Sequence, residues 1–420
     1  MASSQIQKRA FRIRWQKLVL ASVLTGFLAA FLALSLKGLT EYYEFRLFER
    51  ASASLVYSLT LPFIGLSVIY FLREYLFRKK VNKGITEIFE CTASGKNTLP
   101  LYKIPSHFLN GLITVAFGGS TGIEVSTVVA SAAIGTASQK ENLLRHYKTE
   151  LICAGIAAGI TALFNSPIAG LFFAYEVIYR RMTKSFLIAT LPAVAISYAL
   201  VIILNEKSLF NISITTWHLK AAPYFVLLGI LAGVISVYLT RCVMVVKTLF
   251  SKIRVYFHRI ILGAFILSVS IIFLPQLYGD GYHAMNDFFL HPETTLSISL
   301  IATLVLLLML KPIVTSITLA SGGDGGVFAP SLFIGAFLGL TVASILNMYF
   351  NVGVIAINFM VIGMAAVLSA SIHAPLTALF LICGLTGDYK LFVPLLVICF
   401  ISKYTAKALY PKTVYSFTVK

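Results

Sequence analysis

The sequence predicts an all-α integral membrane protein composed of two inverted-topology repeats of tilted and broken helices. Composition is the first reason. Of the 420 residues, 58% are hydrophobic and 12% are charged, whereas a soluble globular domain carries about 25% charged residues. In addition, many apolar segments are short or interrupted by glycine and proline, and two of them recur later in the chain. This composition excludes a soluble protein.

The chain begins with a basic tail, residues 1–17, followed by an apolar run from Leu18 to Leu36. The run has about the length of a membrane-spanning helix and lacks a clear small-residue cleavage site. We therefore predict a retained first helix rather than a signal peptide. The tail is expected to lie in the cytoplasm, because loops rich in Lys and Arg favour that side of the membrane.

The basic residues outnumber the acidic ones, and the formal net charge is +18. In a soluble protein this excess would suggest a nucleic-acid partner. Here the basic residues gather in short runs between apolar segments, at 8–17, 78–83, 180–184 and 252–259. This distribution is typical of cytoplasmic loops that face anionic lipid, so we predict no nucleic-acid partner.

The later apolar segments predict broken helices. Some are shorter than the roughly 20 residues that a span requires, and others are interrupted at Gly118-Gly119, Pro167, Gly322-Gly323 and Pro375. Irregular backbone within a bilayer is tolerated only where it is buried in protein or lines a wet cavity. The interruptions therefore predict a site near the middle of the membrane, where the broken helices meet.

Two stretches of the chain recur in the same order. The segment Ala154–Phe172 aligns with Ile362–Phe380, 208 residues later, and the two segments share paired alanines and one proline. Upstream, the segment from Gly122 to Gly135 aligns with that from Gly326 to Gly339 at an offset of 204 residues. Two matched pairs at nearly the same offset predict an internal two-fold repeat.

We place the first membrane repeat at 18–210 and the second at 211–420. In inverted repeats the equivalent segments enter from opposite sides of the membrane, so their short helices converge near its centre. A helix N-terminus carries about half a positive charge and unpaired N–H groups. Converging N-termini therefore predict an anion site that needs no buried cation.

Glu124 is the only formally charged residue between Gly111 and Ser138, and it lies at the start of the first repeated half-helix. A charge at the bilayer centre costs at least about 2.5–3.5 kcal/mol, so it indicates a function. Alternatively, the carboxylate caps its own helix. The two interpretations overlap, because a carboxylate at an anion-attracting N-terminus competes with a transported anion. We therefore predict that Glu124 gates the site or carries a proton.

Other polar residues point less clearly to function. Glu176 is the only charge from Leu151 to Tyr179, and it either pairs with a nearby arginine at the membrane edge or belongs to a proton path. Asp324 is expected to bond free amides of its glycine-rich turn. His373 lacks a second ligand at metal-binding spacing, and the cysteines are widely separated. No catalytic or metal-binding pattern is present, so we expect neither an enzyme nor a metal cofactor.

The stretch Ser321–Ala336 resembles the GxFxP segment and its lead-in in the CLC family of chloride channels and chloride/proton exchangers. Asn165–Phe173 and Ala370–Ala378 also resemble paired helix starts of that family. The resemblance extends over roughly 15–418. It implies a homodimer in a prokaryotic inner membrane that moves chloride, with protons as a possible second substrate. No regulatory CBS domains are expected within the 420 residues.

The family's gating segment GREGP corresponds to Gly122–Ser126. Glu124 therefore takes the place of the gating glutamate, while its arginine, second glycine and proline are replaced. The resemblance places Ile123 and Val125 beside the bound anion. In the family's GSGIP segment, Lys83 replaces the central serine, and we expect it to influence the inner mouth of the pathway.

The resemblance further implies that the backbone amides of Val327 and Phe328 and the hydroxyl of Tyr415 coordinate the central anion. In many exchangers a pair of glutamates relays the proton on the intracellular side. Here the pair reads Glu176-Val177, so the relay position carries valine, as in the channels. The sequence thus leaves open whether this is a channel or an exchanger. A fluoride/proton antiporter of the same family and a secondary transporter of another small anion remain as alternatives.

Overall fold

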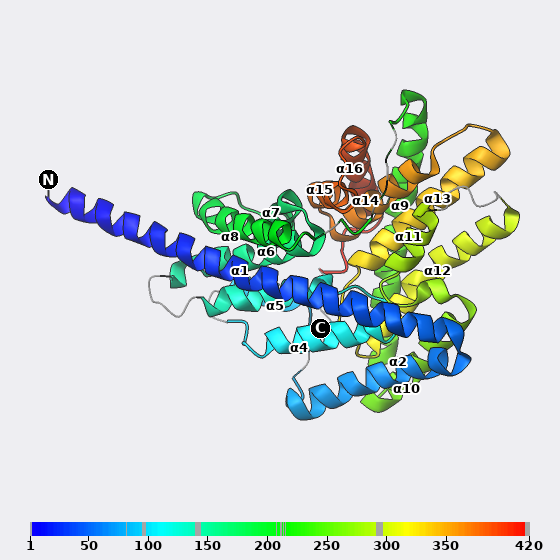
Figure 1. Ribbon diagram of the computed structural model, residues 1–420, viewed down its shortest axis with the longest axis horizontal. Helices are drawn as coiled ribbons and strands as arrows, with labels where there is room; N and C mark the ends of the chain where they lie inside the picture. Colours follow the sequence, from blue (N-terminus) through cyan, green and yellow to red (C-terminus); the bar gives the residue numbers. More distant parts are fainter. Residues whose placement is uncertain are drawn as a thin grey trace.

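The computed structural model describes residues 2–80, 82–94, 98–138, 144–206, 208–210, 212, 214, 216–290 and 297–415. The described chain is built from helices of very different lengths (Figure 1). Those of the first half are α1 Ala2–Ala53, α2 Leu55–Phe71, α3 Ile85–Ser94, α4 Lys103–Ala116, α5 Glu124–Ala137, α6 Lys148–Phe164, α7 Pro167–Phe173 and α8 Lys184–Ile203. Those of the second half are α9 Ala222–Ser251, α10 Tyr256–Phe273, α11 Tyr282–Leu290, α12 Ile298–Ala320, α13 Phe328–Phe350, α14 Ala356–Ile372, α15 Pro375–Thr386 and α16 Phe392–Leu409.

Among the described residues, nine helical segments are long and apolar enough to cross a membrane. Four further apolar helices are shorter, at 10–17 residues. The mixture of full spans and short helices confirms the prediction of an all-α, multi-pass membrane protein with broken helices. It also separates the helices that carry lipid-exposed faces from those, such as α5 and α13, that are buried almost throughout.

The first helix differs from the prediction in length. We expected a span at Leu18–Leu36 after a separate tail, but α1 is continuous from Ala2 to Ala53 and projects well beyond the body of the molecule (Figure 1). No proline interrupts these residues, so the backbone hydrogen-bond ladder is not broken. The predicted tail is therefore the first part of the helix.

The two halves pack in the same way, which confirms the repeat. In the first half α6 lies against α5, α8 and α1, and in the second half α14 lies against α13, α16 and α9. The halves meet through α2 with α10 and through α7 with α15. The predicted boundary near residue 210 stays a prediction, because several residues around it lie outside the described ranges.

Equivalent helix ends are formed by equivalent backbone conformations. Asn165 ends α6 and His373 ends α14, both in the left-handed region with φ of 51° and 56°. In each case a proline two residues later starts the next short helix, as expected from its fixed φ and missing N–H. His373 is therefore a helix-capping residue. Among the described residues, no group of three potential metal ligands exists.

Two of the basic segments, those that follow α2 and α9, lie close together. The Arg73 Nη1 at the end of α2 donates to the hydroxyl of Tyr256 at the start of α10, at 2.8 Å. This contact brings the ends of α2 and α9 together. Elsewhere, an ion pair of 3.1 Å joins Lys37 in α1 to Glu206 after α8. The basic segments that follow α2 and α9 therefore lie near each other, whereas the basic run at 8–17 is part of α1.

Candidate functional site

The starts of α5 and α13 meet through their glycine-rich lead-ins. Gly122 and Gly326 form an isolated antiparallel backbone pair, with N···O distances of 3.3 and 3.0 Å. The hydroxyl of Thr121 adds a hydrogen bond of 2.7 Å to the carbonyl of Gly326. The two half-helices thus begin side by side, as the repeat predicted. Their first N–H groups have no intrahelical partners and provide donors for an anion.

Glu124 places its carboxylate at this junction. The residue is 1% exposed, and its Oε1 accepts a hydrogen bond of 2.8 Å from the hydroxyl of Tyr282. A Cβ atom added to Gly122 would lie 1.9 Å from Oε2 and 2.7 Å from the Cβ of Ala329. The carboxylate therefore folds over Gly122 towards the first turn of α13. Its Oε2 is buried and accepts no hydrogen bond among the described residues.

A cavity of about 140 Å³ extends from the segment before α3, at Asn82 and Lys83, to the junction. It brings together four of the predicted anion-site residues, Lys83, Val125, Val327 and Tyr415. The Tyr415 hydroxyl is buried and has no hydrogen-bond partner among the described residues. Burial raises the pKa of Tyr415 well above its ordinary value. The hydroxyl therefore keeps its proton and can donate it to an anion. We call this space the inner cavity.

Phe328 and Ile123 contribute differently from the residues that line the inner cavity. Ile123 is the residue that precedes α5. The ring of Phe328 is fully buried, with ring-centre distances of 6.5 Å to Phe164 and 5.5 Å to Phe173. This packing anchors the start of α13 against α6 and α7. The expected contacts of Ile123 and Phe328 with an anion would come from their backbone atoms. These contacts stay a prediction.

Lys83 lies at the rim of the inner cavity, with its side chain 58% exposed. Its Nζ is 3.3 Å from the carboxylate of Glu90, and its backbone N–H donates to Glu87 at the start of α3. The ammonium group therefore lies at the mouth rather than beside Glu124. Its influence on the anion stays a prediction.

Glu176 reaches across the two halves of the protein. Its carboxylate accepts hydrogen bonds from the backbone N–H groups of Leu376, at 3.2 Å, and Thr377, at 2.8 Å. The Thr377 hydroxyl adds a third, at 2.8 Å. Glu176 therefore caps the N-terminus of α15 from 200 residues away in sequence. Its neighbour Val177 is 4% exposed and offers no proton-carrying group.

Replacing Glu176 with alanine should destabilise the protein, because two amides and one hydroxyl lose their acceptor. The loss of such a buried acceptor costs about 1–3 kcal/mol. The measurement is the apparent melting temperature of the purified protein in detergent. Glu176→Gln is the matched control, since it keeps one acceptor oxygen and should melt between wild type and Glu176→Ala. Equal melting temperatures for all three proteins would contradict the capping role.

A buried group of charges that was not predicted from the sequence lies on the other side of Glu124. The backbone N–H of Asp280 donates to Glu44 Oε1 at 3.1 Å, and Lys311 Nζ donates to the Gly279 carbonyl at 3.2 Å. Lys311 is the only charge in α12, a signal equal to the one that identified Glu124. Together with Tyr282, Glu44 and Asp280 line a cavity of about 290 Å³, which we call the outer cavity.

Asp324 makes different contacts from those expected. Its carboxylate accepts a hydrogen bond from Asn82 Nδ2 and lies 3.2 Å from Nδ1 of His107. Its backbone N–H donates to the Thr114 hydroxyl at 2.9 Å. The side chain therefore joins α4 and the segment before α3 instead of bonding amides of its own turn.

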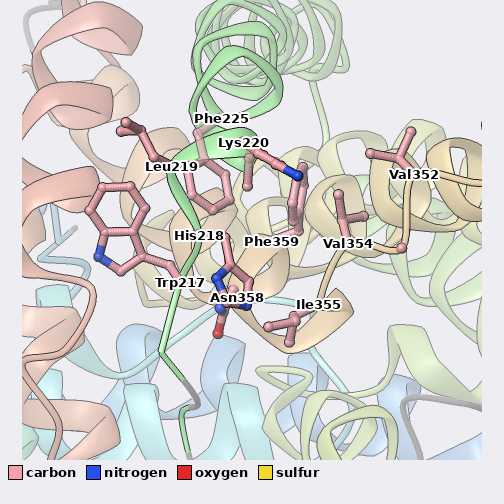
Figure 2. A pocket seen from close by; sticks show the side chains of 12 residues that line it. Trp217, His218, Leu219, Lys220, Phe225, Val352, Val354, Ile355, Asn358 and Phe359 are labelled. Atoms are coloured by element: carbon pink, nitrogen blue, oxygen red, sulfur yellow. The ribbon is translucent and has the colours of Figure 1, made fainter.

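A larger cavity, about 540 Å³, lies away from this site (Figure 2). It is formed between the start of α9 and the α13–α14 connection, where Figure 2 shows Trp217, His218, Phe225 and Asn358 around it. None of the predicted site residues line it. The largest of these cavities is therefore not the one at the helix junction.

The comparisons with known proteins agree with this geometry. The family model described as "Voltage gated chloride channel" matches residues 64–407. A ClcB-like chloride channel protein of Ralstonia nicotianae is 30% identical over 354 residues, which cover 80% of this chain and 79% of that protein. The voltage-gated ClC-type chloride channel ClcB of Escherichia coli O139:H28 is 28% identical over 318 residues, or 73% of each chain.

Solved structures share the fold. A slow cyanobacterial Cl−/H+ antiporter matches with a TM-score of 0.81 at 22% identity, over 95% of this chain and 96% of that one. A CLC-type fluoride/proton antiporter matches with a TM-score of 0.79 at 24% identity, over the same shares. At these identities the likeness establishes the architecture of inverted repeats.

Proposed function

This chain belongs to the voltage-gated chloride channel (CLC) family, and from that premise we propose that it moves chloride through a pathway gated by Glu124. The position of the Glu124 carboxylate is the observation that carries the proposal. It lies where α5 and α13 begin, over Gly122 and beside Ala329. An anion held by the same N-termini would need this position, so the carboxylate and chloride compete for it.

In this mechanism the ionised carboxylate closes the pathway, and protonation or an incoming anion displaces it. The inner cavity leads to the junction past Val327 and the Tyr415 hydroxyl, while Tyr282 separates Glu124 from the outer cavity. Chloride efflux from proteoliposomes, compared between wild type and Glu124→Gln, tests the gate.

We propose that the basic segments, and with them the N-terminus, lie on the cytoplasmic side of a bacterial inner membrane. Support comes from the charge distribution: the basic residues gather in short runs between apolar segments, as they do in positive loops on the cytoplasmic side. The inner cavity then opens to the cytoplasm and the outer cavity to the opposite side. We also propose a homodimer, supported by the exposed apolar side chains Leu191 and Ile203 on α8 and Val393 and Val397 on α16.

Replacing Lys83 with serine should lower the apparent affinity for chloride at the inner mouth. The exposed lysine attracts anions only weakly, since charge pairs at such positions contribute about 0.2–1 kcal/mol, or at most about fivefold. The measurement is the chloride dependence of efflux at low and high ionic strength. Lys79→Ser is the control, because Lys79 is an exposed lysine of the same basic run that does not line the inner cavity. Equal affinity in wild type and Lys83→Ser would leave Lys83 as a solvated loop charge.

Whether the protein is a channel or an exchanger is decided by recording chloride efflux and proton uptake at the same time. Val177 at the relay position cannot carry a proton, which favours a channel. Uphill proton movement driven by a chloride gradient would instead establish exchange. Halide competition in the same assay distinguishes chloride from fluoride as the preferred anion.

A further inference from the structure

We propose that the carboxyl groups of Glu44 and Asp280 form an outer proton-loading site, from which the hydroxyl of Tyr282 passes protons to Glu124. The inference rests on the proposed role of Glu124 as the gate and adds the route by which the gate is protonated. It assigns functions to three residues that the anion pathway itself does not use.

Hydrogen bonds hold these groups close to one another. The Tyr282 hydroxyl donates to Glu124 Oε1 at 2.8 Å, and the Tyr282 backbone N–H donates to Asp280 Oδ1 at 2.8 Å. The Asp280 N–H donates in turn to Glu44 Oε1 at 3.1 Å. These contacts hold both carboxyl groups beside the outer cavity, which Tyr282 also lines.

The charge balance around Glu44 and Asp280 favours a proton bound to one of the two carboxyl groups. Glu44 is 2% exposed and Asp280 is 5% exposed, and Lys311, from α12, is the buried cation whose charge acts on both carboxyl groups. Two ionised carboxylates against one lysine would leave an uncompensated buried charge, which is costly. Glu41 of α1 adds a further negative charge nearby. Burial raises the pKa of Asp280, which lies in the loop outside the spanning helices. The pair therefore holds a proton near neutral pH.

The outer cavity supplies the route to solvent. Glu44, Asp280 and Tyr282 line it, together with the ion pair of Lys37 and Glu206. Lys37 is already paired with Glu206, so it does not compensate the charges of Glu44 and Asp280. His283 also lines the cavity, and burial lowers its pKa, so it stays neutral near neutral pH.

The transfer conserves charge at Tyr282. A proton from the carboxyl pair reaches the tyrosine oxygen through water in the outer cavity, while the tyrosine's own proton moves along its 2.8 Å hydrogen bond to Glu124 Oε1. The tyrosine is neutral before and after the transfer, and one proton has moved from the outer side to the gate. The loading site then takes up a proton from solvent.

Tyr282→Phe tests the relay, because it removes only the hydroxyl. Near pH 7.5 we expect chloride efflux from proteoliposomes to fall at least about tenfold, since a positioned proton-transfer group contributes about 10²–10⁴-fold where transfer limits the rate. Near pH 4.5, around the ordinary pKa of a glutamate, direct protonation should restore the wild-type rate. Tyr278→Phe is the matched control: its buried hydroxyl bonds the Ala116 carbonyl instead, and its efflux should follow wild type.

If Tyr282 has a different role, its removal should have the opposite effect on efflux. If Tyr282 merely held the gate shut, its removal would destabilise the ionised carboxylate and raise efflux near neutral pH. Unchanged or faster efflux in Tyr282→Phe would therefore overturn the relay. Glu44→Gln and Asp280→Asn should show the same slow efflux near pH 7.5 and the same recovery near pH 4.5. The efflux of whichever variant remains monodisperse in detergent is compared with that of Tyr282→Phe.

A double variant separates this inference from the proposed gate. With Glu124→Gln as background, Tyr282→Phe should have no further effect, because the gate no longer needs a proton. A further loss of efflux in the double variant would contradict the relay. If instead Glu124→Gln alone leaves the rate and its pH dependence unchanged, the gate itself is wrong, whatever Tyr282→Phe does.

Discussion

Chloride efflux through Glu124→Gln should be faster than through the wild-type protein near neutral pH and should no longer depend on pH through this residue. The glutamine is neutral, so it cannot compete with chloride for the N-termini of α5 and α13 by charge. An anionic side chain gains up to about 2 kcal/mol at such a position, which corresponds to as much as about 30-fold in the occupancy of the site. Any coupled proton uptake should be abolished.

The measurement is efflux from proteoliposomes over a series of symmetric pH values, with proton uptake recorded in parallel. Glu150→Gln is the matched control: it removes another buried carboxylate, on α6, that accepts a 2.9 Å hydrogen bond from Ser185 and lines neither the inner nor the outer cavity. It should transport like the wild type. A Glu124→Gln variant with unchanged rate and unchanged pH dependence would refute the gate.

The sequence was sufficient for features that depend on local pattern. A lone carboxylate in an apolar stretch is expensive, so Glu124 stood out, and the structure places it at the junction of the half-helices. The two Gly-led segments were aligned by spacing alone, and their first glycines form a backbone pair. Both inferences need only chain order and the physics of the bilayer.

The sequence was insufficient for partners that come from distant parts of the chain. Tyr282, one of twenty tyrosines, gains its role only because the loop before α11 brings it to Glu124. Glu176 caps α15 because the two halves pack together there. Lys311 is a different case, since its isolated charge in α12 was visible in the sequence. The rule that selected Glu124 selects this lysine equally well.

The close approach of α13 and α14 leads to the other large expected effect, on stability. A Cβ atom added to Gly363 would lie 2.1 Å from the Gly335 carbonyl oxygen, and one added to Gly335 would lie 2.3 Å from the Gly363 carbonyl oxygen. Membrane helices depend on such small residues for tight packing. The first half has the same arrangement, with Gly155 against the Ser131 carbonyl at 2.3 Å.

Replacing Gly363 with alanine should therefore lower the melting temperature sharply and reduce the yield of monodisperse protein. The atom in the way is backbone, which cannot rotate aside, so the two helices must separate, and overpacking of this kind costs about 1–3 kcal/mol or more. Gly38→Ala is the control, because an added Cβ at Gly38 in α1 meets nothing within 4 Å. It should be at least as stable as wild type, since alanine is the better helix former.

The same substitution should also disturb transport in the protein that still folds. Gly335 lies two helical turns after Phe328, so a displacement of α13 at the crossing moves the helix start that faces Glu124. We therefore expect folded Gly363→Ala to lose part of the pH dependence of efflux, whereas Gly38→Ala keeps it. Wild-type melting together with wild-type pH dependence in Gly363→Ala would show that the crossing tolerates a methyl group and that α13 is not held by contact between the two backbones.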